Sequence, residues 1–341
     1  MSLPKAMSLT ERLRYRSLWK NLRAEFSGEL ARLEDNLSVA CQGAHAPLPE
    51  AAAQLVEAGG KRVRPLLAWL SCTAVGADAS VADPVALAAE LTHAATLLHD
   101  DVLDEGEVRR GKPASRILHG NRISILAGDF LLTRALGGVF ATRNFEICDS
   151  YQFMLQNMVE GEVLQQEHRF DLATNEEVYE KIVELKTAAL FAWSAKAGAM
   201  AAGADEATTR ALEKFGHGSG IAFQVLDDWL DWVGEGTLVG KAVLSDLKEG
   251  KPSLAVIYGC EMSEEVSRWF ESHLKDDRPP PSDKEVGRLA GMLAECGALA
   301  RVRGRLESAT FGAIEELEVL PASPARDRLV RFARLLLARD S

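Results

Sequence analysis

Cysteine is scarce in this chain of 341 residues, and no two cysteines have the short spacing of a zinc or disulfide framework. The five cysteines are scattered along the chain, at Cys41, Cys72, Cys148, Cys260 and Cys296. Thiols placed in this way are typical of reduced core residues. The sequence therefore indicates a cytoplasmic protein without a disulfide framework or a cysteine-bound zinc.

Long apolar runs and an excess of basic charge are also absent. No window reaches the roughly 18 uninterrupted apolar residues of a membrane span. The charged N-terminal segment lacks the apolar core of a secretory signal. The 39 Lys and Arg residues against 50 Asp and Glu give a formal net charge of −11, opposite to that of most nucleic-acid binders. We expect a soluble protein with no transmembrane segment and no nucleic-acid partner.

Alternation of apolar and polar residues, which marks β-strands, is scarce, whereas helical spacing recurs almost everywhere. Leu87, Leu91, Ala94 and Leu98, for example, form one apolar stripe. With 47% hydrophobic residues, the chain can bury a large core in one large domain or two ordinary ones. The pattern predicts an all-α fold.

Clusters of Gly, Pro and Asp predict where the helices break. We expect a turn at 59–65, a loop at 104–114 and a long, functional loop at 233–252. One helix is expected to begin with Asp83 as its N-cap and Pro84 at its first helical position.

The first notable motif is "DDVLD", at the end of an apolar helix. Asp100 and Asp104 are four residues apart, so a helix places both carboxylates on one face, with Asp101 beside them. Negative charge at a helix C-terminus opposes the macrodipole by about 0.3–1 kcal/mol per charge. A bound divalent cation would offset this cost.

The motif is repeated further along the chain as "DDWLD". Asp227, Asp228 and Asp231 again follow an apolar helical stretch and place i and i+4 carboxylates on one face. A single such motif is more often a solvated face, but two similar copies favour a metal site. Oxygen ligands without Cys or clustered His are typical of Mg²⁺.

One other metal interpretation, a di-iron site, is weaker. Glu90 and His93 have the Glu-x-x-His spacing of di-iron bundles, but those bundles need a second such motif, which the sequence lacks. His93 by itself could equally be an ordinary helix histidine.

Basic residues accompany both acidic motifs. Arg109 and Arg110 follow the first, Lys241, Lys248 and Lys251 follow the second, and Lys186 interrupts an apolar helix. A further group, Lys61, Arg62 and Arg64, stands at a Gly-Gly turn. Arg and Lys are the usual phosphate ligands. Together with the metal site, they suggest two phosphate-bearing groups, one bridged by metal and one held by side chains.

Six segments stand in the order and spacing of one known family. These segments are "GGKRVRP", "HAATLLHDDVLDEGEVRRG", "AGDFLL", "KTAALF", "FQVLDDWLD" and "GKAVLSDLKEGKPS". Over about residues 59–255 the chain resembles the trans-isoprenyl diphosphate synthases, or polyprenyl synthetases. The resemblance implies one domain over 1–341, a single bundle of long helices around a deep central cavity, with C-terminal helices from about 262 and a homodimeric assembly.

The resemblance also implies the reaction. Isopentenyl diphosphate would attack an allylic diphosphate head to tail, with several Mg²⁺ ions bridging the allylic diphosphate to both acidic motifs. Loss of pyrophosphate and of a proton would then give a chain five carbons longer.

The family motifs assign a role to each site residue. The metal ligands would be Asp100, Asp101, Asp104, Asp227, Asp228 and Asp231. The allylic diphosphate would be bound by Arg109, Lys186, Thr187, Gln224, Lys241 and Lys251. Isopentenyl diphosphate would be bound by Lys61, Arg64, His93 and Arg110. Asp100, Asp104, Asp227, Lys186 and Arg109 would carry the catalysis.

The residues before Asp100 suggest the product length, because the resemblance implies that the chain grows along this helix. Ala95 and Thr96, one turn back, are small, and Leu91 and Thr92 lie a further turn back. We therefore predict a product beyond C20, of the octaprenyl to decaprenyl class used for quinone side chains. The alternatives are a geranylgeranyl or farnesyl diphosphate synthase, a class I terpene cyclase and a non-catalytic synthase subunit.

Overall fold

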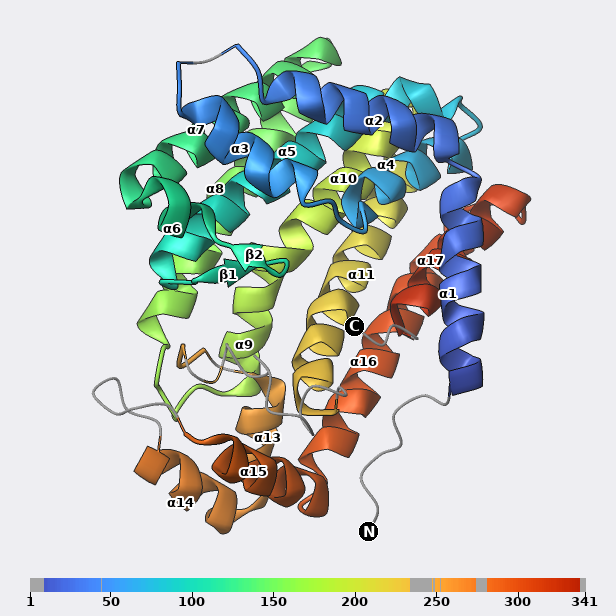
Figure 1. Cartoon of the computed structure of the whole chain (residues 1–341). Helices are drawn as coiled ribbons and strands as arrows, with labels where there is room; N and C mark the ends of the chain where they lie inside the picture. Colours follow the sequence, from blue (N-terminus) through green and yellow to red (C-terminus); the bar gives the residue numbers. More distant parts are fainter. Residues whose placement is uncertain are drawn as a thin grey trace.

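The computed structural model describes residues 9–43, 45–233, 247, 249–251, 253–273 and 281–337, and this part of the chain is almost entirely helical (Figure 1). The prediction of an all-α fold is confirmed. The N-terminal helices and turns are α1 (Leu9–Ala24), α2 (Ser27–Ala40), α3 (Leu48–Glu57), α4 (Val63–Ala74), η1 (Ala79–Ala82), α5 (Asp83–Leu103), α6 (Ser115–His119), α7 (Asn121–Ala141) and α8 (Phe145–Glu167). The C-terminal ones are α9 (Glu176–Val183), η2 (Glu184–Ala188), α10 (Ala189–Ala201), α11 (Glu206–Val233), α13 (Leu254–Met262), α14 (Glu264–His273), α15 (Asp283–Glu295), α16 (Ala298–Glu315), η4 (Glu316–Val319) and α17 (Pro324–Leu337).

Helix α5, which carries the first acidic motif, begins one residue earlier than predicted. Ala82 is the N-cap, and Asp83 already has helical dihedral angles because η1 leads directly into α5. The Asp83 carboxylate instead accepts hydrogen bonds from Trp69 Nε1 at 2.9 Å and Arg32 Nε at 2.8 Å. The predicted N-cap role of Asp83 is therefore wrong, while Pro84 does lie in the first turn.

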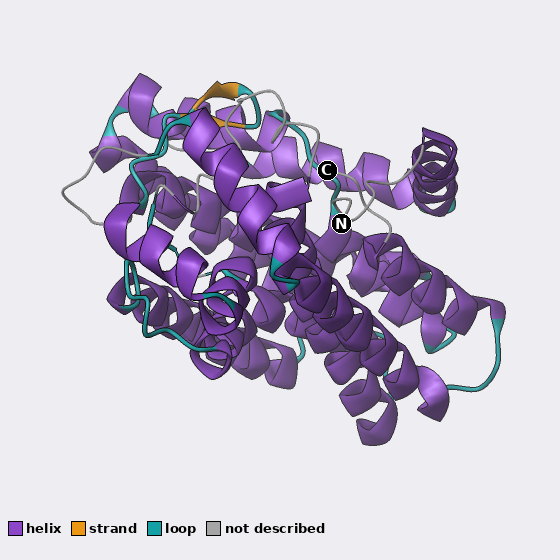
Figure 2. Cartoon of the chain, turned by 90° about the horizontal axis from the view of Figure 1, so that it is seen from below, coloured by secondary structure: helices purple, strands orange, loops and turns teal. Residues whose placement is uncertain are grey.

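The predicted loop at 104–114 contains a very short hairpin, which lies at the edge of the helical assembly (Figure 2). Strands β1 (Val108–Arg109) and β2 (Lys112–Pro113) are antiparallel, with Arg109 opposite Lys112. Arg110 and Gly111 form the two-residue turn with φ of 52° and 74°, the sign pattern of a type I′ turn. Strands of two residues are too short to show alternation in the sequence.

Helices α10 and α11 run side by side through the middle of the molecule (Figure 1). Helix α4 packs on α10, α16 packs on α11, and α5 lies along α7. The approach of α4 and α10 is close: a Cβ atom at Gly198 would lie 2.3 Å from the carbonyl oxygen of Ala68. This packing fixes the two helices that end in acidic motifs, α5 and α11, within one framework.

Two clusters of buried apolar side chains hold the framework together. The first fills the space among α2 to α5, α7, α8, α10 and α17, with Trp69, Tyr151 and Phe332 among its largest members. The second lies among α9, α13 to α16 and the end of α11, and it includes Trp229 and Trp232. A fully buried side chain of this size contributes about 1.5–3 kcal/mol relative to an exposed one.

Helix α7 is the one described helix that is long and apolar enough to cross a membrane by length and composition. Within the structure, 39% of its most apolar window is buried. One side of α7 packs on α5, and Arg122, Asp129 and Arg134 interrupt its apolar sequence. Helix α7 therefore has one side packed in the core and one exposed side that carries apolar residues.

Candidate active site

The first acidic face, formed by Asp100 and Asp104 at the end of α5, lies beside two lysines. Asp104 Oδ2 accepts a hydrogen bond of 2.6 Å from Lys251 Nζ, and Asp100 Oδ1 lies 3.8 Å from Lys186 Nζ. Burial raises the pKa of Asp100, an effect that Lys186 opposes. The carboxylates are thus gathered at a helix end together with the positive charge that they need.

Asp101 faces another direction and orients an arginine of the hairpin. Its side chain is 1% exposed, and Oδ1 lies 2.8 Å from Arg109 Nε and 2.7 Å from Arg109 Nη2. Burial raises the pKa of Asp101, and the Arg109 guanidinium counteracts that rise. The contact fixes where Arg109 can lie relative to the first acidic face.

Lys186 and Thr187 project from η2, a π-helical turn between α9 and α10. Such turns are frequent at functional sites because they change which side chains face inward. Helix α8 passes so close that a Cβ atom at Gly161 would lie 2.7 Å from Lys186 N. Gly161 therefore allows α8 to lie directly against the lysine.

Two residues of α8 that the sequence analysis missed hold Lys186 in place. Gln165 Oε1 accepts a hydrogen bond of 2.8 Å from Lys186 Nζ, and Glu162 forms an ion pair with the same ammonium. Burial opposes ionisation of Glu162, but Lys186 still brings the pKa of this carboxyl below its ordinary value. No local sequence pattern indicates them, because only the fold brings α8 against Lys186.

The second acidic face, at the end of α11, is built on a chain of hydrogen bonds. Thr187 Oγ1 donates to Gln224 Oε1 at 3.1 Å, and Gln224 Nε2 donates to Asp228 Oδ1 at 3.0 Å. Asp228 is buried, and its Oδ2 accepts from Leu254 N at 3.3 Å. Both Asp228 oxygens thus have protein donors, while Asp227 and Asp231 are only half-buried. The metal-ligand role of Asp228 stays a prediction.

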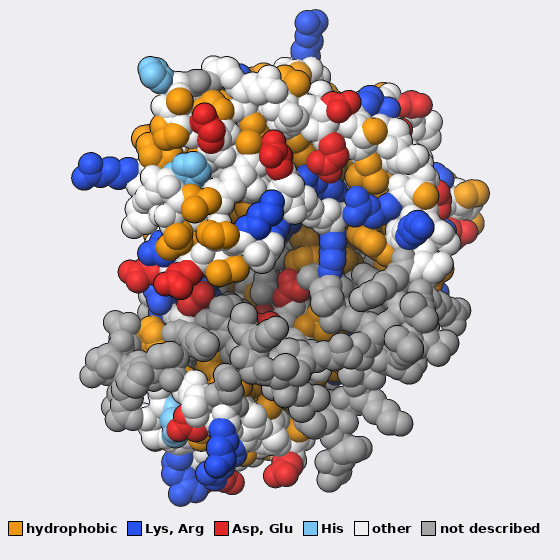
Figure 3. Space-filling model, viewed as in Figure 1, with side chains coloured by type: hydrophobic (Ala, Val, Ile, Leu, Met, Phe, Trp, Pro, Cys, Tyr) orange, Lys and Arg blue, Asp and Glu red, His pale blue; other side chains and the backbone are white. Residues whose placement is uncertain are grey.

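The two acidic faces are brought together by neighbouring residues. Lys186 contacts Asp100 of the first face. The next residue, Thr187, is hydrogen-bonded to Gln224, which is in turn hydrogen-bonded to Asp228 of the second face. Lys251 binds Asp104, and Leu254, three residues later, binds Asp228. Three residues span at most about 10 Å. Figure 3 shows Lys and Arg side chains around a hollow in the middle of this face, with acidic side chains beside them.

A second cationic group lies beside the turn at Gly59 and Gly60. Arg64 Cζ lies 4.8 Å from the centre of the Phe191 ring, and Arg64 Nε is buried without a hydrogen-bond partner. Arg110 Nη1 donates to the carbonyl oxygens of Leu55, at 3.3 Å, and Gly59. None of the ion pairs found among the described residues includes Arg64 or Arg110. Positive charge without a carboxylate partner is suited to bind an anion.

Electrostatics supports the same interpretation of this group. Burial lowers the pKa of Arg64 to about 10 and also lowers the pKa of Arg110. Burial, reinforced by Arg64 and Arg110, holds the pKa of His93 well below its ordinary value. Burial is the main cause of each shift, and an anion bound nearby would favour the charged form of each group. Lys61 lies at the same turn and is half-buried.

Lys241 lies outside the described residues, as does most of the predicted loop at 233–252.

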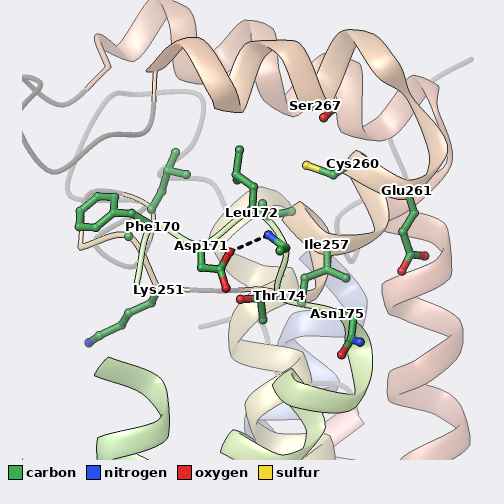
Figure 4. Close-up of a pocket in the computed structure, with 14 residues that line it drawn as sticks. Phe170, Asp171, Leu172, Thr174, Asn175, Lys251, Ile257, Cys260, Glu261 and Ser267 are labelled. Atoms are coloured by element: carbon green, nitrogen blue, oxygen red, sulfur yellow. Dashed lines mark hydrogen bonds between the residues drawn. The ribbon is translucent and has the colours of Figure 1, made fainter. Parts of the chain in front are cut away.

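A cavity of about 310 Å³ lies next to the site (Figure 4). Its walls come from the segment between α8 and α9 and from α13, and Lys251 is the predicted site residue among those that line it. In Figure 4 the Lys251 side chain points away from Ile257 and Cys260. The cavity therefore adjoins the site without being its centre.

Comparison with known proteins identifies the family. The model of the family described as "Polyprenyl synthetase" matches residues 45–289.

The chain belongs to the polyprenyl synthetase family.

This polyprenyl synthetase is 35% identical over 287 residues to octaprenyl diphosphate synthase of Escherichia coli (strain K12), covering 84% of this chain and 88% of that protein. It is 37% identical over 297 residues to short chain isoprenyl diphosphate synthase of Methanothermobacter thermautotrophicus, covering 86% and 90%. A solved polyprenyl synthase from Caulobacter crescentus CB15, complexed with calcium and isoprenyl diphosphate, superposes with a TM-score of 0.88 at 32% identity, covering 95% and 98%. The chain is thus a prenyltransferase with the isoprenoid synthase fold.

The acidic faces of the polyprenyl synthetase fit a hard divalent cation. In the described part of the chain no three His, Cys, Asp or Glu side chains already converge as a metal site. However, Asp104 Oδ1 and Asp101 Oδ2 are buried without a hydrogen-bond partner, and all candidate donors are oxygens. Oxygen donors with spare coordination capacity match the preference of Mg²⁺.

The residues predicted to set product length lie along α5, and one of them contacts a tyrosine of α8. Leu91, Thr92 and Ala95 are fully buried, and Thr96 Oγ1 donates to His93 O at 3.0 Å. Thr92 Oγ1 lies 2.7 Å from the hydroxyl of Tyr151 on α8. The Tyr151 ring packs edge-on against Trp193, with 5.0 Å between ring centres. No motif in the sequence indicates this pair of aromatic residues.

Proposed function

We propose that this polyprenyl synthetase condenses isopentenyl diphosphate with an allylic diphosphate, head to tail, to a trans-polyprenyl diphosphate longer than C20. One observation carries the proposal. The structure has two sets of cations, one in ion pairs with the acidic faces and one, Arg64 and Arg110, that takes part in none of the ion pairs found among the described residues. A reaction of two diphosphates needs two such sets, whereas a terpene cyclase needs one.

The proposed role of each residue follows from its position relative to the two acidic faces. Lys186, Lys251 and Arg109 stand beside the first acidic face, where they would hold the allylic diphosphate, and the predicted role of Lys241 is the same. Thr187 and Gln224 would fix the position of the second acidic face relative to Lys186, through their hydrogen bonds to each other and to Asp228. Mg²⁺ ions held by Asp100, Asp104, Asp227 and Asp231, with Asp101 and Asp228 in support, would supply positive charge to the departing diphosphate.

The bond changes follow from this arrangement. The allylic C–O bond breaks, and its electron pair leaves with the diphosphate, where the preplaced cations stabilise the developing charge. Isopentenyl diphosphate, held by Lys61, Arg64, His93 and Arg110, offers its double bond to the allylic carbon. Loss of one proton from the isopentenyl unit then restores a double bond. Because the cations are in place beforehand, little reorganisation is needed as charge develops.

Product length is proposed to depend on the turns of α5 before Asp100. Ala95 is fully buried, but both it and Thr96 are small, so a growing chain would meet little side-chain bulk at this turn. The contact between Thr92 and Tyr151 lies eight residues from Asp100, about 12 Å along the helix. We infer that Tyr151, which packs against Trp193, limits the length of the product.

The same contact favours a second candidate function. If the contact between Thr92 and Tyr151 stays in place as the chain grows, elongation would stop there. The product would then be of geranylgeranyl size, which is shorter than the one proposed. The relatives do not decide between the two, since they include both octaprenyl and short-chain enzymes.

An incubation with labelled isopentenyl diphosphate, Mg²⁺ and geranyl, farnesyl or geranylgeranyl diphosphate tests both candidates. We expect Mg²⁺-dependent incorporation and, on chromatography, a product beyond C20. A product that ends at C20 would support the second candidate. No incorporation with any primer would contradict the proposed reaction.

We also propose that the enzyme is a homodimer of single-domain, cytoplasmic chains. Large apolar side chains are exposed on α6, α7 and α8, where α7 packs against both α6 and α8. They are Ile117, Leu118, Ile125, Leu126, Leu136, Phe140, Phe145, Phe153, Val159 and Val163, here called the α6–α8 face. An exposed apolar surface of this extent is typical of a protein interface.

A further inference from the structure

Arg62 stands between two predicted isopentenyl diphosphate ligands, Lys61 and Arg64, yet its guanidinium is paired with two carboxylates. Its side chain is 2% exposed. Nη1 donates to Glu90 Oε1 on α5 at 2.7 Å, and Nε and Nη2 donate to the two oxygens of Glu34 on α2 at 2.9 and 2.8 Å. Nη2 also donates to Val56 O at 3.1 Å. Arg62 thereby connects α2, α3 and α5.

The backbone at Arg62 is in a conformation that residues with a side chain rarely adopt. Its φ is 51°, in the left-handed region, at the N-cap of α4. This conformation sets the direction in which the chain passes from Lys61 into α4, where Arg64 lies. A strained conformation persists only when its surroundings hold it. The hydrogen bonds to Glu34 and Glu90 are the contacts that do so.

Glu90 also acts on the site electrostatically. It lies three residues before His93 on α5, so both side chains project from neighbouring positions of one helix face. Its negative charge opposes the loss of the proton from both Arg64 and Arg110. For Arg110, Glu90 is the carboxylate that acts in this way. One side chain therefore holds the turn and balances the charge of the two arginines.

Resting on the function proposed above, we propose that Arg62, Glu90 and Glu34 are positioning residues for the isopentenyl diphosphate site. They hold Lys61 and Arg64 at the correct angle without touching the substrate. Glu34 lies outside residues 45–289, which the family model matches. A helix near the N-terminus thus contributes to the binding of one substrate and not of the other.

The test compares Glu90→Gln and Glu34→Gln with Glu29→Gln, which alters another ion pair of α2, between Glu29 and Arg32. Initial rates are measured with each substrate varied separately. We expect the KM for isopentenyl diphosphate to rise about tenfold in Glu90→Gln, as for the loss of one strong polar contact, and by a smaller factor in Glu34→Gln. The KM for the allylic substrate and kcat should stay within about twofold, and Glu29→Gln should match the wild type.

Two results would overturn the proposal. One is an equal change of both KM values, and the other is a lowered melting temperature with both KM values unchanged. If Glu90→Gln does not fold, Glu34→Gln decides, because the Glu34 side chain is 50% exposed. If the wild type makes no product, the proposed function fails, and calorimetric titration of isopentenyl diphosphate into the wild type and Glu34→Gln then tests positioning by itself. Equal affinities, or no binding to either protein, would contradict it.

Discussion

At the scale of single residues, product length depends on the side chains that line α5. Ala95 is fully buried one turn before the Asp100 face. A Phe at this position adds a large ring to a packed interior, where it must either block a growing chain or displace its neighbours.

We expect Ala95→Phe to shorten the product by at least one isoprene unit while incorporation of label continues. Val39→Phe is the control, because Val39 is exposed to solvent on α2 and lies outside the predicted site. Products are compared by chromatography after removal of the diphosphate. An unchanged length in Ala95→Phe would show that α5 does not set the limit.

His93 predicts a pH dependence of stability. Its pKa in the folded protein is well below the ordinary 6.5, because of burial and of the nearby Arg64 and Arg110. Above that ordinary value both states are neutral, and no stability is lost. As the pH falls below it, the unfolded state takes up a proton that the folded state refuses, so folding becomes less favourable by up to about 1.4 kcal/mol per pH unit.

We therefore expect the free energy of unfolding to fall between pH 7.5 and 5.5, and His93→Gln to remove part of that fall. Urea denaturation at each pH measures both proteins. His217, whose pKa burial also lowers, remains in both and provides a common background. The same pH dependence in both proteins would contradict the low pKa of His93.

At the scale of elements, the site depends on the close approach of α8 to η2. A Cβ atom at position 161 would lie 2.7 Å from both Leu185 Cβ and Lys186 N, so the π-helical turn would have to move. Such a shift moves Lys186 away from Asp100, which it contacts at 3.8 Å. Displacements of about 1 Å can cost on the order of 100-fold in rate.

Gly161→Ala is therefore expected to lower kcat at least tenfold, while Gly304→Ala leaves it unchanged. Gly304 lies in α16 with no atom near the position of an added Cβ, so this substitution should stabilise the protein by about 0.5–1 kcal/mol. Steady-state rates and thermal melts measure both variants. Full activity in Gly161→Ala would show that the turn tolerates displacement.

Sequence patterns predicted the elements better than their contacts. The periodicity around Leu91 predicted α5, and the acidic motifs placed Asp100 and Asp227 near helix ends, because these features depend on residues close together in the chain. The partners of Lys186 could not be predicted in this way, since Glu162 and Gln165 lie on another helix and no local pattern requires them. The π-helical turn could not be predicted either, because its residues have ordinary helical spacing.

At the scale of the whole molecule, the α6–α8 face predicts association between two copies. Phe153→Glu and Leu126→Glu would place charges in an apolar contact, whose burial without partners is costly. We expect the wild type to sediment at twice the mass of one chain, and the double variant at the mass of one chain.

Phe311→Glu is the control for that experiment, because Phe311 is similarly exposed but lies on α16, outside this face. It should leave the sedimentation of the wild type unchanged. A wild type that sediments as a single chain, or a double variant that stays associated, would contradict the proposed homodimer.

The central claim is that two facing acidic helix ends, with the lysines beside them, carry out prenyl transfer. The most direct measurement is the rate of pyrophosphate release by Asp100→Asn and Asp227→Asn, compared with Asp35→Asn, which alters an exposed aspartate of α2. Circular dichroism verifies that each variant is folded. We predict that both site variants lose activity by at least about 100-fold, while Asp35→Asn keeps the wild-type rate. A folded Asp100→Asn or Asp227→Asn variant with the wild-type rate would contradict the account.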